Sequence, residues 1–200
     1  MPKHLIEAAI ARGQGKSANG ASLEPVTIEA ILPSNVAAVI DFETDSRLRT
    51  LQEARLIVKK AGGNVSPTGY LFERKGRIVF LGKDDVGVDE VLEAALGYDA
   101  LDVVEGDEGR IVVFTAPADT KATAESLSRD LGLDIETSDI IYDPVEDTMA
   151  EVNKEADLEM LKDFAEKITE ESGFQGLYIN AKPGPSIEPR WQELVDRLDA

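Results

Sequence analysis

Apolar residues recur at the spacing of an amphipathic helix in two well-marked places. The first stripe consists of Leu51, Ala54, Ile57, Val58 and Ala61. Thr50, followed three positions later by Glu53, predicts a capping box at the start of this helix. The second stripe lies near the C-terminus and consists of Trp191, Leu194, Val195 and Leu198. Because so short a helix is marginal in isolation, we expect it to pack on the rest of the protein through Trp191, Leu194 and Leu198.

Other segments complete a mixed pattern. Helices are predicted over residues 2–12, 88–96, 120–131 and 155–171. Strands are predicted over 26–32, 36–43, 77–81, 101–105, 110–116, 134–142, 146–152 and 174–180. Between residues 74 and 143 the order is βαββαβ, which is that of a ferredoxin-like sandwich. The sequence therefore predicts an α+β fold.

The elements after Pro144 are too few to form a domain, because one face of their sheet would stay uncovered. They would complete a sheet with residues 25–73. We therefore expect two ferredoxin-like α/β domains, the second inserted into the first. Residues 25–74 and 145–180 form the discontinuous domain, and residues 75–144 form the inserted one. Residues 1–24 form a helix and linker, and 181–200 a tail with a short helix.

Charge divides the chain into two parts. The formal net charge is −18. Residues 1–81 contain 11 basic and 8 acidic residues, a net charge of +3, whereas residues 82–200 contain 10 and 31, a net charge of −21. A polyanion is repelled by the acidic part, so any contact with nucleic acid is expected in the first 81 residues. The acidic part is otherwise typical of a solvated surface.

The residues needed for catalysis are scarce. The chain has no cysteine and a single histidine, His4, in a predicted terminal helix. The segment from Gly13 to Ser17 ends like a phosphate-binding loop, but Ile10 stands where the first glycine is required. No apolar run reaches the roughly 20 residues of a membrane span. We predict no catalytic residue, no metal site, no cofactor and no membrane contact.

The basic residues of the first part are more informative. They gather around the helix at 51–61 and the turn that follows it: Arg47, Arg49, Arg55, Lys59, Lys60, Arg74 and Lys75. One interpretation is a solvated helix face. The other is a patch that contacts phosphates, which requires this density of cations without base-reading geometry.

At these positions the sequence resembles the YebC/PmpR family, whose mitochondrial relatives include a translational activator of cytochrome c oxidase. Four blocks carry the resemblance: MPKHLIEAAIARGQG at residues 1–15, TDSRLRT at 44–50, GGN with LFERKG at 62–64 and 71–76, and VLEAAL at 91–96. In the family, the MPK segment follows two basic helices. The resemblance therefore implies that most of a helical N-terminal domain is missing and that residues 1–24 are its remnant. The family's glycine-rich segment before the second strand is replaced by residues 30–35.

The resemblance implies a non-enzymatic regulator of gene expression. It favours a translation activator at the mitochondrial ribosome or on RNA, and it transfers a binding role to Arg47, Arg49 and Lys75. A DNA-binding transcriptional regulator is the alternative, and a ligand-binding or enzymatic α/β protein is the third reading. Binding by this chain is expected to be weak, because the missing helices would add positive charge. The resemblance favours a mitochondrial location, with the cytoplasm as the alternative. It leaves the oligomeric state open.

Overall fold

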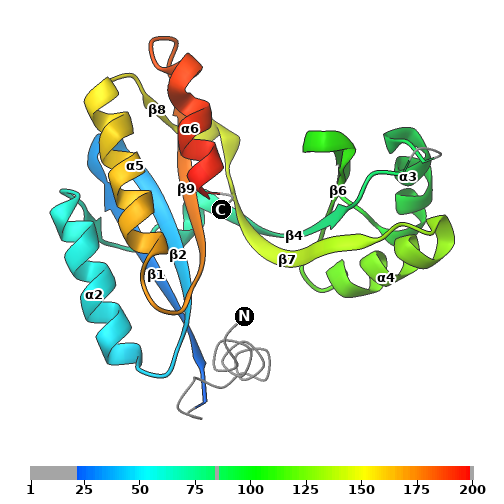
Figure 1. Ribbon diagram of the computed structural model, residues 1–200, viewed down its shortest axis with the longest axis horizontal. Helices are drawn as coiled ribbons and strands as arrows, with labels where there is room; N and C mark the ends of the chain where they lie inside the picture. The colour runs from blue at the N-terminus through cyan, green and yellow to red at the C-terminus, as the bar shows by residue number, and fades with distance from the viewer. Residues whose placement is uncertain (1–21, 84–85, 199–200) are drawn as a thin grey trace, which may run out of the picture. The chain divides into compact units, whose positions relative to one another are not determined.

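The computed structural model describes residues 22–83 and 86–198, apart from the side chains of residues 196 and 197. The chain divides into two compact units: Met1–Phe72 with Pro144–Ala200, called here the first unit, and Glu73–Asp143, called the inserted unit (Figure 1). The predicted α+β class and the insertion of one unit into the other are confirmed. The helix expected over residues 2–12 lies outside the described residues.

The first unit is built on a five-stranded sheet with the order β3-β1-β2-β9-β8. The strands are β1 (Glu24–Leu32), β2 (Val36–Thr44), β3 (Asn64–Val65), β8 (Ala150–Val152) and β9 (Phe174–Pro183). β1 and β2 form the predicted hairpin, whose turn at Pro33–Asn35 places Ser34 and Asn35 in the left-handed region. β9 pairs antiparallel with β2, so strands that precede and follow the inserted unit in the sequence belong to one sheet.

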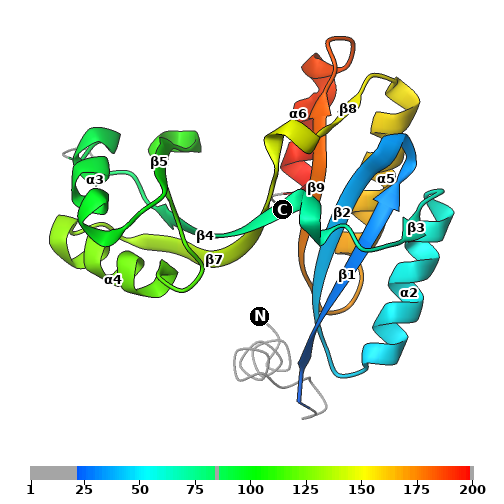
Figure 2. The same ribbon diagram turned by 180° about the vertical axis from the view of Figure 1, so that it is seen from behind.

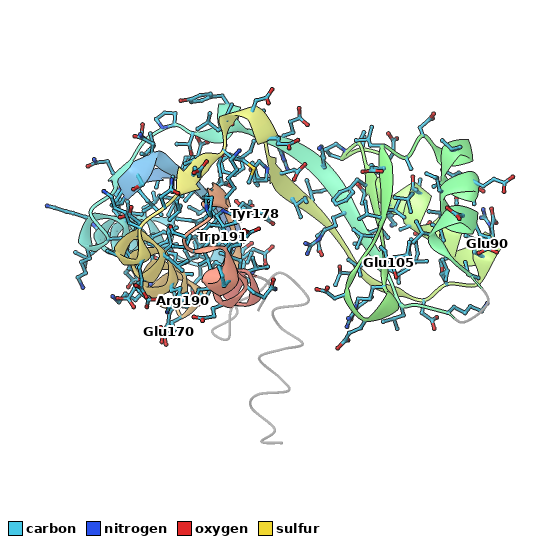
Figure 3. The ribbon with its side chains drawn as sticks, turned by 90° about the horizontal axis from the view of Figure 1, so that it is seen from above. Glu90, Glu105, Glu170, Tyr178, Arg190 and Trp191 are labelled. Carbon is cyan, nitrogen blue, oxygen red and sulfur yellow. The ribbon has the colours of Figure 1, made fainter. Side chains whose placement is uncertain are left out.

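Three helices cover one face of this sheet: α2 (Arg47–Lys60), α5 (Glu155–Thr169) and α6 (Glu188–Leu198) (Figures 1 and 2). β1 follows the two-residue period of a strand and buries Val26, Ile28, Ala30 and Leu32 in the same core as residues from the helices. The apolar stripe of α6 also joins this core: Leu194 is buried, and Leu198 and Trp191 pack against the cluster. Trp191 is labelled in Figure 3. The expected docking of the C-terminal helix is therefore confirmed.

The opposite face of the sheet is covered by the segment that leaves β3. Glu29 of β1 points away from the helices, and its carboxylate accepts hydrogen bonds from the backbone N–H groups of Thr68 (2.5 Å) and Gly69 (2.7 Å). On the same segment, the carbonyl oxygen of Leu71 accepts a hydrogen bond from the side-chain amide of Asn180 on β9 (2.9 Å). These polar contacts fasten the segment across the sheet immediately before the chain enters the inserted unit.

The inserted unit has the predicted ferredoxin-like order. Its elements are β4 (Phe72–Phe80), α3 (Val88–Ala95), β5 (Asp102–Glu105), β6 (Ile111–Thr115), α4 (Thr120–Leu131) and β7 (Ile135–Pro144). The sheet order is β5-β6-β4-β7, so the first and last strands of the unit are neighbours. The core of this unit contains Ile78 and Phe80 of β4, Val113 of β6, Val91 of α3 and Leu127 of α4.

The structure departs from the sequence-based expectation in two places. In the first unit, β8 and β9 are adjacent and parallel, whereas the ferredoxin-like order would place an antiparallel strand between them. The strand predicted over residues 146–152 is shorter. It is preceded by a 3-10 turn at Glu146–Thr148, because the Thr148 hydroxyl donates a hydrogen bond to the carbonyl oxygen of Val145 (2.8 Å) and curls the chain.

Asn180 links the segment that leads into the inserted unit with the segment that follows it. Its buried amide donates to the carbonyl oxygen of Leu71 and to the hydroxyl oxygen of Thr148, each at 2.9 Å. We predict that Asn180→Ala lowers the free energy of unfolding of the first unit by about 1–3 kcal/mol, because buried acceptors lose their donor. Urea unfolding followed by the fluorescence of Trp191, the single tryptophan, measures this unit.

The matched control is Asn153→Ala, because Asn153 is exposed and its amide donates a hydrogen bond to the surface carboxylate of Glu151. This change should cost less than about 0.5 kcal/mol. An equal loss of stability in both variants would contradict a specific stabilising role of the buried Asn180 hydrogen bonds.

Candidate nucleic-acid interface

The start of α2 is fixed by two threonine hydroxyls rather than by the predicted capping box. The helix begins at Arg47, and its N-cap residue Ser46 makes no side-chain capping bond. Thr44, at the end of β2, accepts hydrogen bonds at its hydroxyl oxygen from the backbone N–H of Ser46 (3.0 Å) and from the hydroxyl of Thr50 (2.8 Å). The prediction of a cap at Thr50 was therefore wrong, because Thr50 is buried inside the first turn and bonds to the preceding strand.

The predicted apolar stripe decides which way the cations of α2 face. Ala54, Ile57 and Val58 are buried in the core of the first unit, and Leu51 and Ala61 pack against that core. Arg47, Arg49, Arg55, Lys59 and Lys60 are exposed. Lys59 and Lys60 lie in the last turn, where the helix dipole favours positive charge. The helix therefore presents five cations to solvent.

The five cations differ in how far other residues neutralise them. Arg49 contacts Asp45 at 3.2 Å and Glu53 at 3.9 Å. For Arg47, Arg55, Lys59 and Lys60, no ion pair with another residue of the described segments is present. Ion pairs on the surface are weak, so the contacts with Asp45 and Glu53 reduce the attraction of Arg49 for an external anion without preventing it from binding one. The four other side chains are open to an external anion.

Arg74 and Lys75 lie in the inserted unit and not on α2. Lys75 is partly buried, and its ammonium contacts Asp143 at 2.6 Å and Glu73 at 3.3 Å. The hydrogen bond to Asp143 raises the pKa of Lys75, so the charge is firmly held but already compensated. The Arg74 guanidinium lies 5.5 Å from the centre of the Tyr142 ring, within cation–π range. The single cluster suggested by the sequence is thus divided between the two units.

Aromatic side chains do not interleave with the cations of α2. Tyr70 is 75% exposed in a 3-10 turn, and Phe72 is buried at the start of β4. The base-stacking platform of single-strand readers needs exposed rings beside the cations, and α2 itself contains no aromatic residue.

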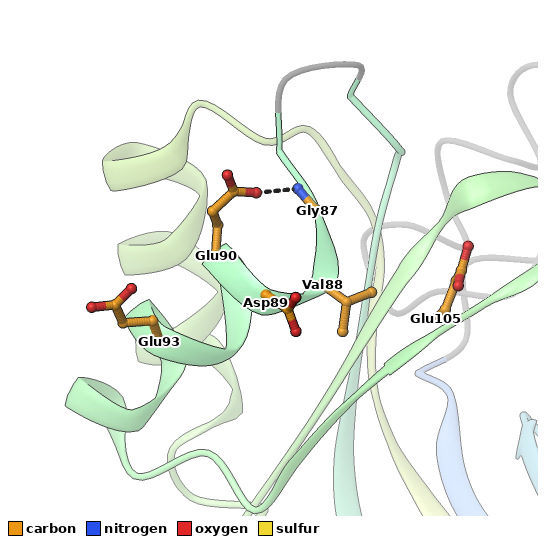
Figure 4. A pocket seen from close by; sticks show the side chains of 6 residues that line it. All are labelled: Gly87, Val88, Asp89, Glu90, Glu93 and Glu105. Atoms are coloured by element: carbon orange, nitrogen blue, oxygen red, sulfur yellow. Dashed lines mark hydrogen bonds between the residues drawn. The ribbon is translucent and has the colours of Figure 1, made fainter.

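A hollow of about 410 Å³ in the inserted unit has the opposite charge. It is lined by Gly87, Val88, Asp89, Glu90, Glu93 and Glu105, from the start of α3 and the end of β5 (Figure 4). Glu90 is engaged there, because its carboxylate accepts a hydrogen bond from the backbone N–H of Gly87. Four carboxylates repel phosphate, so this hollow is excluded from a nucleic-acid site.

No metal centre is formed by the residues that the structure describes, since no group of three or more His, Asp or Glu side chains is placed to hold an ion. Within the same residues, no helix is long and apolar enough to cross a membrane. His4 and the segment from Gly13 to Ser17 lie outside the described residues. Two leucines that are not part of the predicted apolar stripe, Leu48 and Leu56, are exposed on the cationic face of α2. Their place between the cations is visible only once the helix start is known.

These features define a class of protein: an α+β body in which a ferredoxin-like unit interrupts a second α/β unit that carries a basic helix. Residues 23–181 match the family model described as "TACO1/YebC second and third domain", and the chain belongs to this family.

Two bacterial proteins and one crystal structure support the same family assignment. A protein of Leptospira biflexa is 35% identical over 191 residues, which span 94% of this chain and 75% of the relative. A protein of Acidithiobacillus ferrooxidans is 40% identical over 184 residues, spanning 90% and 70%. Both are named "Probable transcriptional regulatory protein". The crystal structure of a conserved hypothetical protein from Aquifex aeolicus is similar, with a TM-score of 0.73 and 31% identity over 94% of this chain and 76% of that one.

The origin of the α2 start can be tested with two substitutions. We predict that Thr50→Val lowers the free energy of unfolding by about 1 kcal/mol, because a buried hydrogen bond to Thr44 is lost while the side-chain shape is kept. Glu53→Ala removes only an exposed pair with Arg49 and should cost less than about 0.5 kcal/mol. Urea titrations followed by Trp191 fluorescence compare the two. A larger loss for Glu53→Ala than for Thr50→Val would restore the capping-box interpretation, because alanine cannot bond back to the N-cap.

Proposed function

We propose that this protein regulates gene expression without catalysing a reaction, by attaching to RNA, most directly RNA of the ribosome, through the outer face of α2. The observation that carries the proposal is the set of exposed cations Arg47, Arg55, Lys59 and Lys60, without ion-pair partners in the described structure, on a helix whose other side is fixed in a core. The names of the relatives support the broader role in gene regulation.

The geometry supports contact with the phosphate backbone more than reading of bases. The helix is held flat against its sheet by Ala54, Ile57 and Val58, so it offers its flank and not a projecting end. Phosphate contacts position a protein on nucleic acid but carry no sequence information. This favours a structured RNA, whose shape supplies the specificity, over a short operator sequence. Because Lys75 is already paired with Asp143, we expect it to contribute little to phosphate binding.

The alternative is a DNA-binding transcriptional regulator, and the printed names of the relatives favour it. Those relatives are bacterial, so they give no support to a mitochondrial location. An enzymatic or ligand-binding role has less support, because the hollow beside α3 is lined by carboxylates, a glycine and a valine, with no hydroxyl, amine or imidazole side chain beside them.

The proposal is tested by reversing three charges on α2. We predict that Arg47→Glu/Arg55→Glu/Lys59→Glu weakens binding of a labelled ribosomal RNA fragment and flattens the dependence of log K on log salt. Each lost phosphate contact should remove about 0.7–0.9 from the slope. Fluorescence titrations at several salt concentrations measure both quantities, and circular dichroism establishes that the variant is folded.

The matched control is Lys121→Glu/Lys154→Glu/Lys167→Glu, which changes the net charge equally on exposed residues outside α2. Equal loss of binding in the control would assign the effect to net charge and not to the α2 face. Unchanged binding in the α2 variant would mean that its cations are only a solvated surface. Binding of duplex DNA in preference to RNA of the same length would favour the transcriptional alternative.

A further inference from the structure

Two exposed leucines on α2 have no role in a phosphate contact. Leu48 is 69% exposed and Leu56 is 51% exposed, and they lie two turns apart on the face that points away from the core. Arg55 precedes Leu56 in the helix, and Lys59 lies one turn beyond it. An apolar side chain gains nothing from a phosphate, but it gains about 25 cal/mol for each Å² buried against another apolar surface. The outer face of α2 therefore has the composition of a protein-binding surface with a cationic border.

A second helix has the same arrangement with opposite charge. On α3, Leu92 is 40% exposed, and Leu96, immediately after the helix, is 70% exposed. One helical turn separates them, so they lie on the same side of the helix. Asp89 and Glu93 alternate with them, and both carboxylates also line the acidic hollow (Figure 4). The outer face of α3 is therefore apolar with an anionic border.

We propose that the α2 face of one copy of this protein docks on the α3 face of a second copy. The leucines of the two helices oppose each other, and Arg55 and Lys59 face Asp89 and Glu93. The charges of the two regions support this choice of partner. Residues 47–60 contain five cations and one carboxylate, a net charge of +4. Residues 73–143 contain 7 cations and 18 carboxylates, a net charge of −11. Complementary charge of this kind steers association and fixes orientation.

The contact joins two different surfaces, so it is heterologous. A copy that uses α2 for one neighbour keeps its α3 free for another, and such contacts form rings or open chains. The net charge of −18 on every copy opposes growth, so association should be weak and limited to high protein concentration at low salt. Because nucleic acid is proposed to bind the same face of α2, RNA and a second copy would compete. The self-association itself does not depend on the RNA proposal.

Sedimentation velocity of the full chain, without nucleic acid, tests the proposal. The weight-average mass should rise towards twice the monomer mass with increasing concentration at low salt. It should return to the monomer mass at about 0.5 M salt, where the Debye length is only a few ångström. Arg55→Glu/Lys59→Glu and Asp89→Lys/Glu93→Lys should each remain monomeric. An equimolar mixture of these two variants should associate again, because each retains one intact surface and the reversed surfaces are complementary.

Two control variants have the same net charge as the α2 and α3 variants and leave both faces intact: Lys121→Glu/Lys167→Glu and Glu125→Lys/Asp163→Lys should associate like the wild type. Leu48→Ser/Leu56→Ser is a third test variant, which removes the apolar side chains of the α2 face and should stay monomeric. A wild type that stays monomeric at all concentrations would overturn the proposal. It would also be overturned if the controls lose association with the α2 and α3 variants, or if the mixture of those variants stays monomeric.

Discussion

The pairing of β2 with β9 is the constraint on which the remaining structure depends. It brings Val39 opposite Tyr178, so a sheet is closed between residues that the whole inserted unit separates along the chain. Such a closure requires the insertion to begin and end at neighbouring points. The ferredoxin-like order satisfies this requirement, because its first and last strands, β4 and β7, are adjacent. The backbone N–H of Val145 donates to the carbonyl oxygen of Leu71 at 3.0 Å, and Asn180 holds the same oxygen, so the outgoing and returning passages are tied together.

Several residues of the blocks that resemble the family serve this architecture and not a partner. Gly62 has a φ of +83°, and a Cβ on Gly63 would lie 2.6 Å from the carbonyl oxygen of Ile31, so the chain can turn from α2 back to β1 only with glycine. A Cβ on Gly76 would lie 1.9 Å from the Thr120 hydroxyl, where α4 approaches β4. The resemblance is therefore strong evidence for the fold, whereas the function depends on the exposed residues between these glycines.

Local periodicity explains what could be predicted. The stripes of α2 and α6 and the alternation of β1 are properties of a few consecutive residues, and the ferredoxin-like order follows from the succession of such segments. What could not be predicted depends on residues far apart. Thr50 bonds to Thr44 rather than capping its own helix, Lys75 is compensated by Asp143 from the other end of the inserted unit, and β8 is a strand through its parallel pairing with β9. The seven candidate cations are exposed or partly exposed, but their division between two units can be recognised only from the tertiary structure.

The distribution of charge, more than its total, determines what each surface of this protein can meet. Screening confines an exposed charge to about 10 Å at ordinary ionic strength, so a partner at α2 experiences mainly the local +4 of that helix. At longer range the net charge of −18 repels a polyanion, which slows encounters and lowers affinity without abolishing contact. A cationic helix on an acidic body therefore suits attachment to a site where other interactions already hold the protein close. On the ribosome that we propose as the partner, basic surfaces beside the RNA would attract the acidic body while α2 meets the phosphates.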